Sequence, residues 1–351
     1  MWFIAFICLI VLGAGLFCVA AGIVMFRVLC VRRVYMKKSP VDFSDHVKDN
    51  RIMDPLLEAK ERWAVKPVKK ITMPMQAFWV FRLFSAKALS KKQLVGDLWL
   101  QPSTEKKKIV AVLVHGFSDS AAGMAYLAES YYERGCSVLS VNLRAHGESD
   151  GRFTGLGYLK TDAEDLARWV AYIKESLGDD THIILHGVSM GGVTVLQCAF
   201  GLSAPIAFAV EDCGFSDFSA YLKNHLRVLL SSGFLSRLAV SGIVFVASCI
   251  NFFVNGFFFS QNSPKNIIKN AKKSGGKGET GRQIPLLLFH GANDKLVKPS
   301  ASEELFAVAS DPKEIITVEN APHIGSWFYD KEKYMNTIFV YVDKYIYSDL
   351  K

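Results

Sequence analysis

The chain has 351 residues, of which 50 % are hydrophobic, 12 % aromatic and 21 % charged. A disordered chain would be rich in charge and poor in aromatic residues, so this composition indicates a folded protein. The net charge of +8 is concentrated, because residues 27–108 hold 19 Lys and Arg against 8 Asp and Glu. Nucleic-acid binding would need a recognition motif beside a basic stripe, and neither is visible, so we expect no nucleic-acid partner. A basic stretch beside a membrane accounts better for the charge.

The N-terminus predicts a membrane segment. Residues Met1–Phe26 contain no charged side chain, and a helix of 26 residues can span a hydrocarbon core of about 30 Å. A cleaved signal peptide would begin with basic residues and have a shorter apolar run. We therefore expect a single-pass transmembrane anchor with a basic flank over residues 1–38, which contacts the lipid bilayer through residues 1–26. Basic residues that follow the run favour a cytoplasmic location for the rest of the chain, although the opposite orientation stays open.

An alternation of strands and helices begins after residue 90. Residues 39–89 contain four prolines and are interpreted as a linker with short elements. We expect strands at 93–100, 108–114, 137–142, 182–185, 206–210, 284–289 and 314–318, and helices at 121–134, 162–177, 193–200 and 331–347. This order predicts an α/β protein with a mainly parallel sheet that is covered by helices on both faces. Its core would consist of residues 90–214 and 283–351.

A serine motif follows the strand expected at 182–185. Gly187-Val188-Ser189-Met190-Gly191 fits the pattern G-x-S-x-G, and the residues after it continue as a helix. Such a strand–turn–helix is the context of a nucleophile elbow, in which a tight turn projects the serine hydroxyl above the sheet edge. Small residues are required two positions before and two positions after the serine. We therefore predict that Ser189 is a catalytic nucleophile.

A serine nucleophile needs a histidine base and a carboxylate that orients it. In this topology the chain order is Ser, acid and then His, which selects His323 after the last strand and Asp294 after the preceding one. Asp212 or Asp217 remains an alternative acid. All these residues follow the carboxyl ends of strands, where open α/β sheets place their sites. The backbone N–H groups of Phe117 and Met190 are the expected oxyanion-hole donors.

These motifs together resemble the α/β-hydrolase-fold serine hydrolases. The matching segments are His115-Gly116-Phe117, residues 142–150, residues 187–192, Gly291-Ala292-Asn293-Asp294 and His323. One departure is Asn142, where many members of the family carry Asp. Glu211-Asp212-Cys213-Gly214 makes the chain most similar to bacterial membrane-anchored hydrolases of this fold. The resemblance covers roughly residues 90–348 and implies a fold and a reaction class.

Residues 215–282 interrupt the alternation. They include an uncharged run of 22 residues at 238–259, which by hydropathy alone predicts a second transmembrane helix. A span there would put Ser189 and His323 on opposite sides of the bilayer, which is incompatible with a triad. We interpret the segment as a helical cap or lid, either packed on protein alone or also touching lipid.

Other reactive side chains have less specific patterns. His115, His146 and His290 each precede a glycine at a strand end and are interpreted as packing and hydrogen-bonding residues beneath the site. His182 and His186 lack the companions of a metal site. Cys213 lacks an elbow and is interpreted as a small buried residue.

The sequence therefore predicts a membrane-bound hydrolase of small-molecule carboxylic esters that needs no metal or cofactor. A thioesterase, acyltransferase or peptidase with the same triad is the alternative, as is a non-catalytic membrane scaffold. The oligomeric state stays open.

Overall fold

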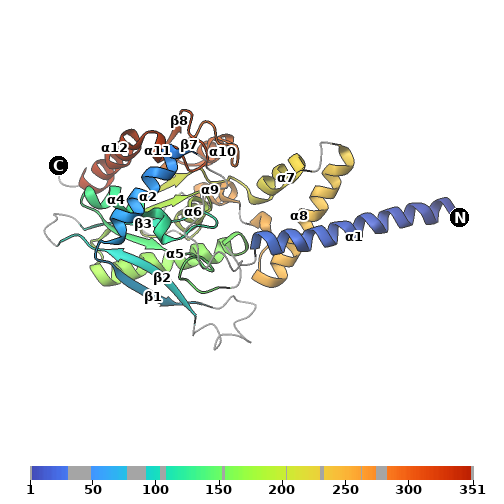
Figure 1. The fold of residues 1–351 in the computed structure, drawn as a ribbon, viewed down its shortest axis with the longest axis horizontal. Helices are drawn as coiled ribbons and strands as arrows, with labels where there is room; N and C mark the ends of the chain where they lie inside the picture. Colours follow the sequence, from blue (N-terminus) through green and yellow to red (C-terminus); the bar gives the residue numbers. More distant parts are fainter. Residues whose placement is uncertain are drawn as a thin grey trace.

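The computed structural model describes residues 2–30, 49–76, 92–102, 108–151, 155–202, 204–229, 233–261, 263–273 and 283–348. Its centre is an eight-stranded sheet in the order β1-β2-β4-β3-β5-β6-β7-β8 (Figure 1). The strands are β1 Lys69–Pro74, β2 Gln93–Trp99, β3 Ile109–Val114, β4 Ser137–Val141, β5 His182–Val188, β6 Phe208–Asp212, β7 Leu286–Gly291 and β8 Lys313–Val318. β1 pairs antiparallel with β2, β2 pairs antiparallel with β4, and the other pairs are parallel.

Helices cover both faces of the sheet, as the alternation predicts. They are α4 Ala125–Glu133 after a 3₁₀ turn at Ala121–Met124, α5 Gly155–Leu177, α6 Met190–Leu196, α10 Ser300–Val308, α11 Ser326–Tyr329 and α12 Lys331–Val342. α6 and α12 continue into the π-helical turns Gln197–Gly201 and Asp343–Tyr347. One buried cluster joins the sheet to α5, α6 and α10, and a second joins it to α4 and α12. All residues of β3 and β7 are buried, since parallel strands between two helical layers have no solvent face.

The segment interpreted as a linker contains two elements of the domain. Helix α2, Asn50–Ala64, packs on the second buried cluster, and β1 forms an edge of the sheet. The buried residues of α2 recur at helical spacing: Ile52, Leu56, Ala59 and Trp63. Pro55 lies inside this helix, and it is the feature that hid the pattern, because proline normally breaks a helix interior. Burial of the apolar face offsets that cost.

Helices fill the interval between β6 and β7, where the sequence predicts an insertion. They are α7 Phe218–Leu229, α8 Phe234–Asn255, a 3₁₀ turn at Phe259–Gln261 and α9 Pro264–Lys273. α8 packs on protein through polar as well as apolar residues. Its Asn251 side chain donates to the Phe257 carbonyl at 2.8 Å, and its Ser248 hydroxyl accepts from the Phe259 N–H at 2.9 Å.

The N-terminal helix α1, Trp2–Cys30, projects from the body of the molecule and crosses α8 (Figure 1). The crossing is close because it contains glycine: a Cβ at Gly22 would lie 2.7 Å from Val246, and a Cβ at Gly242 would lie 3.0 Å from the Cys18 sulfur. Near its C-terminal end, Met25, Phe26 and Cys30 are buried in the protein core.

The predicted N-terminal span at residues 1–26 is not supported. In the part of the chain that the structure describes, the helix that is long and apolar enough to cross a membrane is α8, and the described apolar part of α1, Leu12–Val28, is shorter than a span. Met25 and Phe26, at the end of the predicted span, are buried in the protein core.

Candidate active site

Ser189 stands on a tight turn between β5 and α6. Its backbone has φ +55° and ψ −118°, a conformation that side-chain-bearing residues rarely adopt. The turn requires its two glycines, since a Cβ at Gly187 would lie 2.2 Å from the Gly191 carbonyl oxygen and one at Gly191 would lie 2.1 Å from that of Val114. The G-x-S-x-G sequence thus folds as an elbow with Ser189 at its tip.

The structure brings the three predicted triad residues together. His323 Nε2 lies 2.9 Å from Ser189 Oγ, and His323 Nδ1 lies 2.6 Å from Asp294 Oδ2. The register of the sheet explains the meeting, because Val188 pairs with Asp212, Asp212 with Phe289, and Gly291 with Val318. Parallel strands in this register end at one edge, and each triad residue lies just beyond that edge.

The Asp294 carboxylate is held on both oxygens. Oδ1 accepts the N–H groups of Leu296 and Val297, each at 2.8 Å, while Oδ2 faces two histidine rings. Burial alone would raise the pKa of Asp294, but hydrogen bonds with His290 and His323 outweigh it and lower the pKa to about 2. The group is therefore an anion that is oriented toward His323.

The two alternative acids have other partners. Asp212 accepts hydrogen bonds from the Ser326 hydroxyl at 2.8 Å and the Tyr334 hydroxyl at 3.0 Å, and burial raises its pKa to about 6. Asp217 accepts the Ala220 N–H at 2.7 Å in the first turn of α7. Asp294 is the carboxylate that hydrogen-bonds to His323.

The loop that carries Phe117 lies against the elbow. A Cβ at Gly116 would be 3.5 Å from the Ser189 Cβ and 3.4 Å from the Val188 carbonyl oxygen. Met190 is the first residue of α6 and is buried directly after Ser189. Both predicted oxyanion donors thus belong to segments that adjoin the nucleophile.

His115, His146 and His186 lie in the protein interior. His115 Nε2 accepts the Leu143 N–H at 3.1 Å, and His146 Nδ1 lies 2.9 Å from the Arg144 carbonyl. His186 lies between the hydroxyls of Tyr131 and Tyr334, each 2.9 Å from one ring nitrogen, so it is not poised to bind a metal with His182. Burial lowers the pKa of His115 and of His186 to about 3, which keeps both rings neutral.

His290 has a more specific place than the sequence indicated. Its Nε2 lies 3.2 Å from Asp294 Oδ2 and 2.8 Å from the Val297 carbonyl, and its Nδ1 lies 2.7 Å from the Ser302 hydroxyl. It therefore contacts the same oxygen of the acid that His323 contacts. The signal in the sequence was its position four residues before Asp294.

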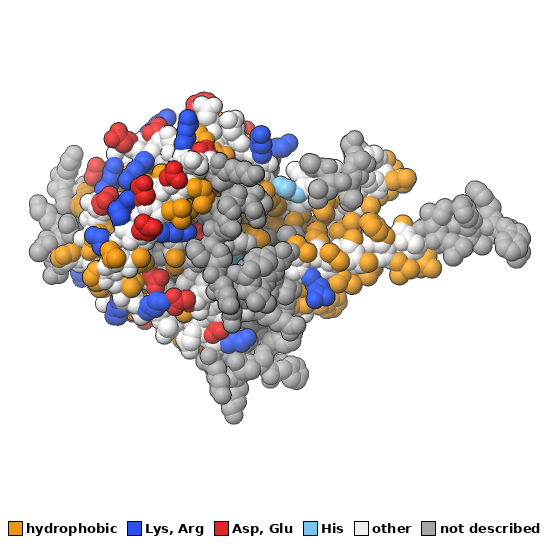
Figure 2. Space-filling model, viewed as in Figure 1, with side chains coloured by type: hydrophobic (Ala, Val, Ile, Leu, Met, Phe, Trp, Pro, Cys, Tyr) orange, Lys and Arg blue, Asp and Glu red, His pale blue; other side chains and the backbone are white. Residues whose placement is uncertain are grey.

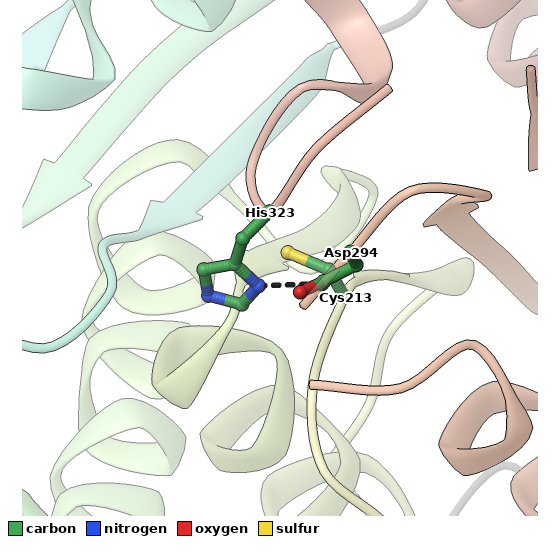
Figure 3. Close-up of side chains that lie close together, drawn as sticks. All are labelled: Cys213, Asp294 and His323. Carbon is green, nitrogen blue, oxygen red and sulfur yellow. Dashed lines mark hydrogen bonds and ion pairs between the residues drawn. The ribbon is translucent and has the colours of Figure 1, made fainter. Parts of the chain in front are cut away.

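Cys213 also lies closer to the triad than the sequence indicated. Figure 3 shows its thiol beside Asp294 and His323, and the three side chains offer ligand atoms within 4.8 Å of one another. Such a group is compact enough for a metal ion. However, burial raises the pKa of this thiol well above its ordinary value, and a protonated thiol is a poor metal ligand. Asp294 and His323 are moreover already bonded to each other.

Comparison with known proteins identifies the fold. A family model described as serine aminopeptidase, S33, matches residues 104–211. An esterase of Pyrococcus furiosus superposes with a TM-score of 0.57 at 17 % identity, covering 82 % of this chain and 94 % of that one. The chain has the α/β-hydrolase fold. The ferulic acid complex of Est1E from Butyrivibrio proteoclasticus shares this fold with a TM-score of 0.52 at 18 % identity, covering 73 % of this chain and 97 % of the other.

Two sequence relatives align with about two thirds of this chain. A thermostable monoacylglycerol lipase of a Bacillus strain is 25 % identical over 242 residues, which is 65 % of this chain and 87 % of the lipase. The uncharacterized protein YqkD of Bacillus subtilis is 25 % identical over 237 residues, which is 66 % of this chain and 70 % of that protein.

Proposed function

We propose that the protein is a serine hydrolase that cleaves carboxylic esters. The observation that carries the proposal is the continuous contact from Ser189 through His323 to Asp294, at 2.9 and 2.6 Å, on a strained elbow at the carboxyl edge of the sheet. A structural serine in a turn has no need of a histidine that is itself oriented by a buried carboxylate.

The proposed reaction proceeds through an acyl-enzyme. Ser189 Oγ attacks the ester carbonyl while His323 Nε2 takes its proton, and the ring then returns that proton to the leaving alcohol. Asp294 orients the ring and stabilises its charged form. The N–H groups of Phe117 and Met190 are the proposed donors to the oxyanion, each worth about 2.7–4 kcal/mol of transition-state stabilisation. Water activated by His323 then releases the acid.

The named relatives favour an ester over an amide. The monoacylglycerol lipase and the superposed Pyrococcus furiosus esterase act on esters according to their names, whereas the family description names an aminopeptidase. A peptidase is therefore the second candidate. It predicts cleavage of aminoacyl naphthylamides at a rate comparable with that of ester hydrolysis.

A fluorophosphonate probe tests the nucleophile. We expect labelling of the wild type, loss of labelling in Ser189→Ala, and full labelling in Ser300→Ala, where an exposed serine at the start of α10 is removed. Labelling that persists in Ser189→Ala would overturn the proposal. The same three proteins are then compared on p-nitrophenyl acetate and on an aminoacyl naphthylamide.

We also propose that the α1–α8 pair attaches the protein to a lipid bilayer, with the catalytic domain on the cytoplasmic side. Figure 2 shows hydrophobic side chains gathered over the projecting helices, whereas charged side chains cover the body. Large apolar residues of both helices are exposed, among them Leu16 at 63 %, Val24 at 60 %, Phe245 at 67 % and Phe253 at 75 %. An exposed surface of this kind is costly in water and typical of a membrane contact.

Extraction of membranes at alkaline pH tests this attachment. We expect the wild type to stay in the membrane pellet, and Leu16→Glu combined with Val24→Glu to move it toward the soluble fraction. Val340→Glu is the control, because Val340 is 61 % exposed on α12, away from the projecting helices. Equal partitioning of all three proteins would contradict the attachment.

A further inference from the structure

A pocket opens beside His323 on the side of α2. It is lined by Ile52 and Leu56 from α2, by Gly116 and Val188 from the strand ends around the nucleophile, and by His323 with Phe328. The sequence predicts a cap or lid at residues 215–282. Two of the side chains that line this pocket instead come from the segment interpreted as a linker.

The pocket is small and almost wholly apolar. The cavity volume is about 10 Å³, which is room for about one water molecule or one methyl group. Ile52 and Leu56 are 2 % and 1 % exposed, so the pocket is bounded by packed side chains. Asp119 contributes the carboxylate at its margin, and one of its oxygens accepts the Ser120 N–H at 2.7 Å.

Contacts with α4 and β2 fix the C-terminal half of α2. Arg62 makes two 2.8 Å hydrogen bonds to the two carboxylate oxygens of Glu129 on α4, a paired geometry with fixed direction. Trp63 packs on Trp99 of β2 with ring centroids 4.9 Å apart. These contacts anchor the C-terminal half of the helix that presents Leu56.

We propose that α2 sets substrate size by limiting one group of the ester, next to the scissile bond, to a short apolar chain of about one or two carbon atoms. This inference rests on the proposed ester hydrolysis. Its physical basis is the adjacency of the pocket to His323, Gly116 and Val188, together with the bulk of Ile52 and Leu56. A longer chain on that group would have to displace side chains from a packed interior.

Two substrate series test the proposal on the full-length protein. In one series the acyl chain of a p-nitrophenyl ester grows from acetate to butyrate to octanoate. In the other the acyl group stays acetyl and the alcohol grows from methanol to butanol to octanol. We expect wild-type kcat/KM to fall with chain length in one series, and that series identifies which side of the ester enters the pocket.

Variants of α2 supply the decisive comparison. Leu56→Ala and the milder Ile52→Val are expected to raise the long-to-short ratio of kcat/KM by about tenfold, the size of effect that one or two methylenes have in an apolar pocket. Leu57→Ala is the matched control, since Leu57 lies on the same helix and is 51 % exposed. Thermal unfolding verifies that each variant is folded, and Ile52→Val removes little enough volume to keep the test valid if Leu56→Ala unfolds.

The possible outcomes distinguish a failure of the pocket proposal from a failure of the proposed ester hydrolysis. The pocket proposal would be overturned if the wild type is active but its long-to-short ratio of kcat/KM does not respond to Leu56→Ala or Ile52→Val, or responds equally to Leu57→Ala. The proposed ester hydrolysis would then still stand. Absence of both probe labelling at Ser189 and ester hydrolysis would overturn both.

Discussion

His290 and His323 contact the same oxygen of Asp294, at 3.2 and 2.6 Å. Burial lowers the pKa of His290, but its bonds with Asp294 and the Val297 carbonyl more than compensate, so the pKa is raised overall. A charged His290 would share the carboxylate with His323 and weaken its support for the His323 imidazolium. The charged groups that act on His290 are Glu211 and Asp212 on β6 and Asp294 beyond β7.

Replacing His290 therefore tests its effect on the catalytic base. His290→Gln removes an imidazole that lies 3.2 Å from Asp294 Oδ2 and gains a positive charge on protonation, so the carboxylate oxygen is left to His323 alone. We expect the acidic limb of the pH profile of kcat/KM to move up by about one pH unit. His225→Gln, on α7, should leave the profile unchanged. A loss of rate at every pH without a shift of the limb would mean that His290 has a packing role alone.

Neutralising the acid tests the orientation of the base. Asp294→Asn removes the charge that stabilises protonated His323 and offers an amide where Nδ1–H needs an acceptor. We expect kcat to fall by about 10⁴-fold, with binding of substrate little changed. Steady-state kinetics on p-nitrophenyl acetate measures both quantities. If Asp212→Asn lost kcat to this extent while Asp294→Asn kept it, the orienting role would belong to Asp212.

The low pKa of Asp294 also predicts a loss of stability in acid. Its pKa is about 2 in the folded protein and about 4 when unfolded, so the stabilisation is present above pH 4 and is lost as the pH falls toward 2. The difference between these two pKa values corresponds to about 2 kcal/mol in the free energy of unfolding. The free energy of unfolding in urea should change less between pH 6 and pH 3 for Asp294→Asn than for the wild type. The exposed Asp179→Asn should behave as the wild type.

The raised pKa of Glu211 predicts that stability falls as the pH rises. It is completely buried, and burial raises its pKa to about 8, although its Oε1 accepts the Gly214 N–H. The folded state therefore holds a proton that the unfolded state loses above about pH 4.5, so stability falls as the pH rises from there to 8. Glu211→Gln should reduce the decline in melting temperature between pH 5 and pH 8. A decline of unchanged size would show that Glu211 is already ionised in the folded protein.

The motifs that carry the proposed chemistry could be predicted from sequence because each is local. A tight elbow needs glycine at 187 and 191, and the backbone at Ser189 adopts the strained conformation that this spacing implies. The strand runs likewise predicted the parallel part of the sheet, since strands buried on both faces consist of apolar runs. The chain order of Ser189, Asp294 and His323 then followed from the topology.

Tertiary structure decided what depends on contacts between distant segments. α2 and β1 were hidden among prolines, and their places against α4 and β2 arise from burial and edge pairing that local propensity does not encode. The second contact of Asp294, with His290, depends on how the chain turns beyond β7. The division of α1 between protein core and exposed surface depends on its crossing with α8, more than 200 residues away in sequence. The sequence by itself thus predicted the residues of the proposed chemistry, through local steric rules, whereas packing between remote segments decided which side chains surround them.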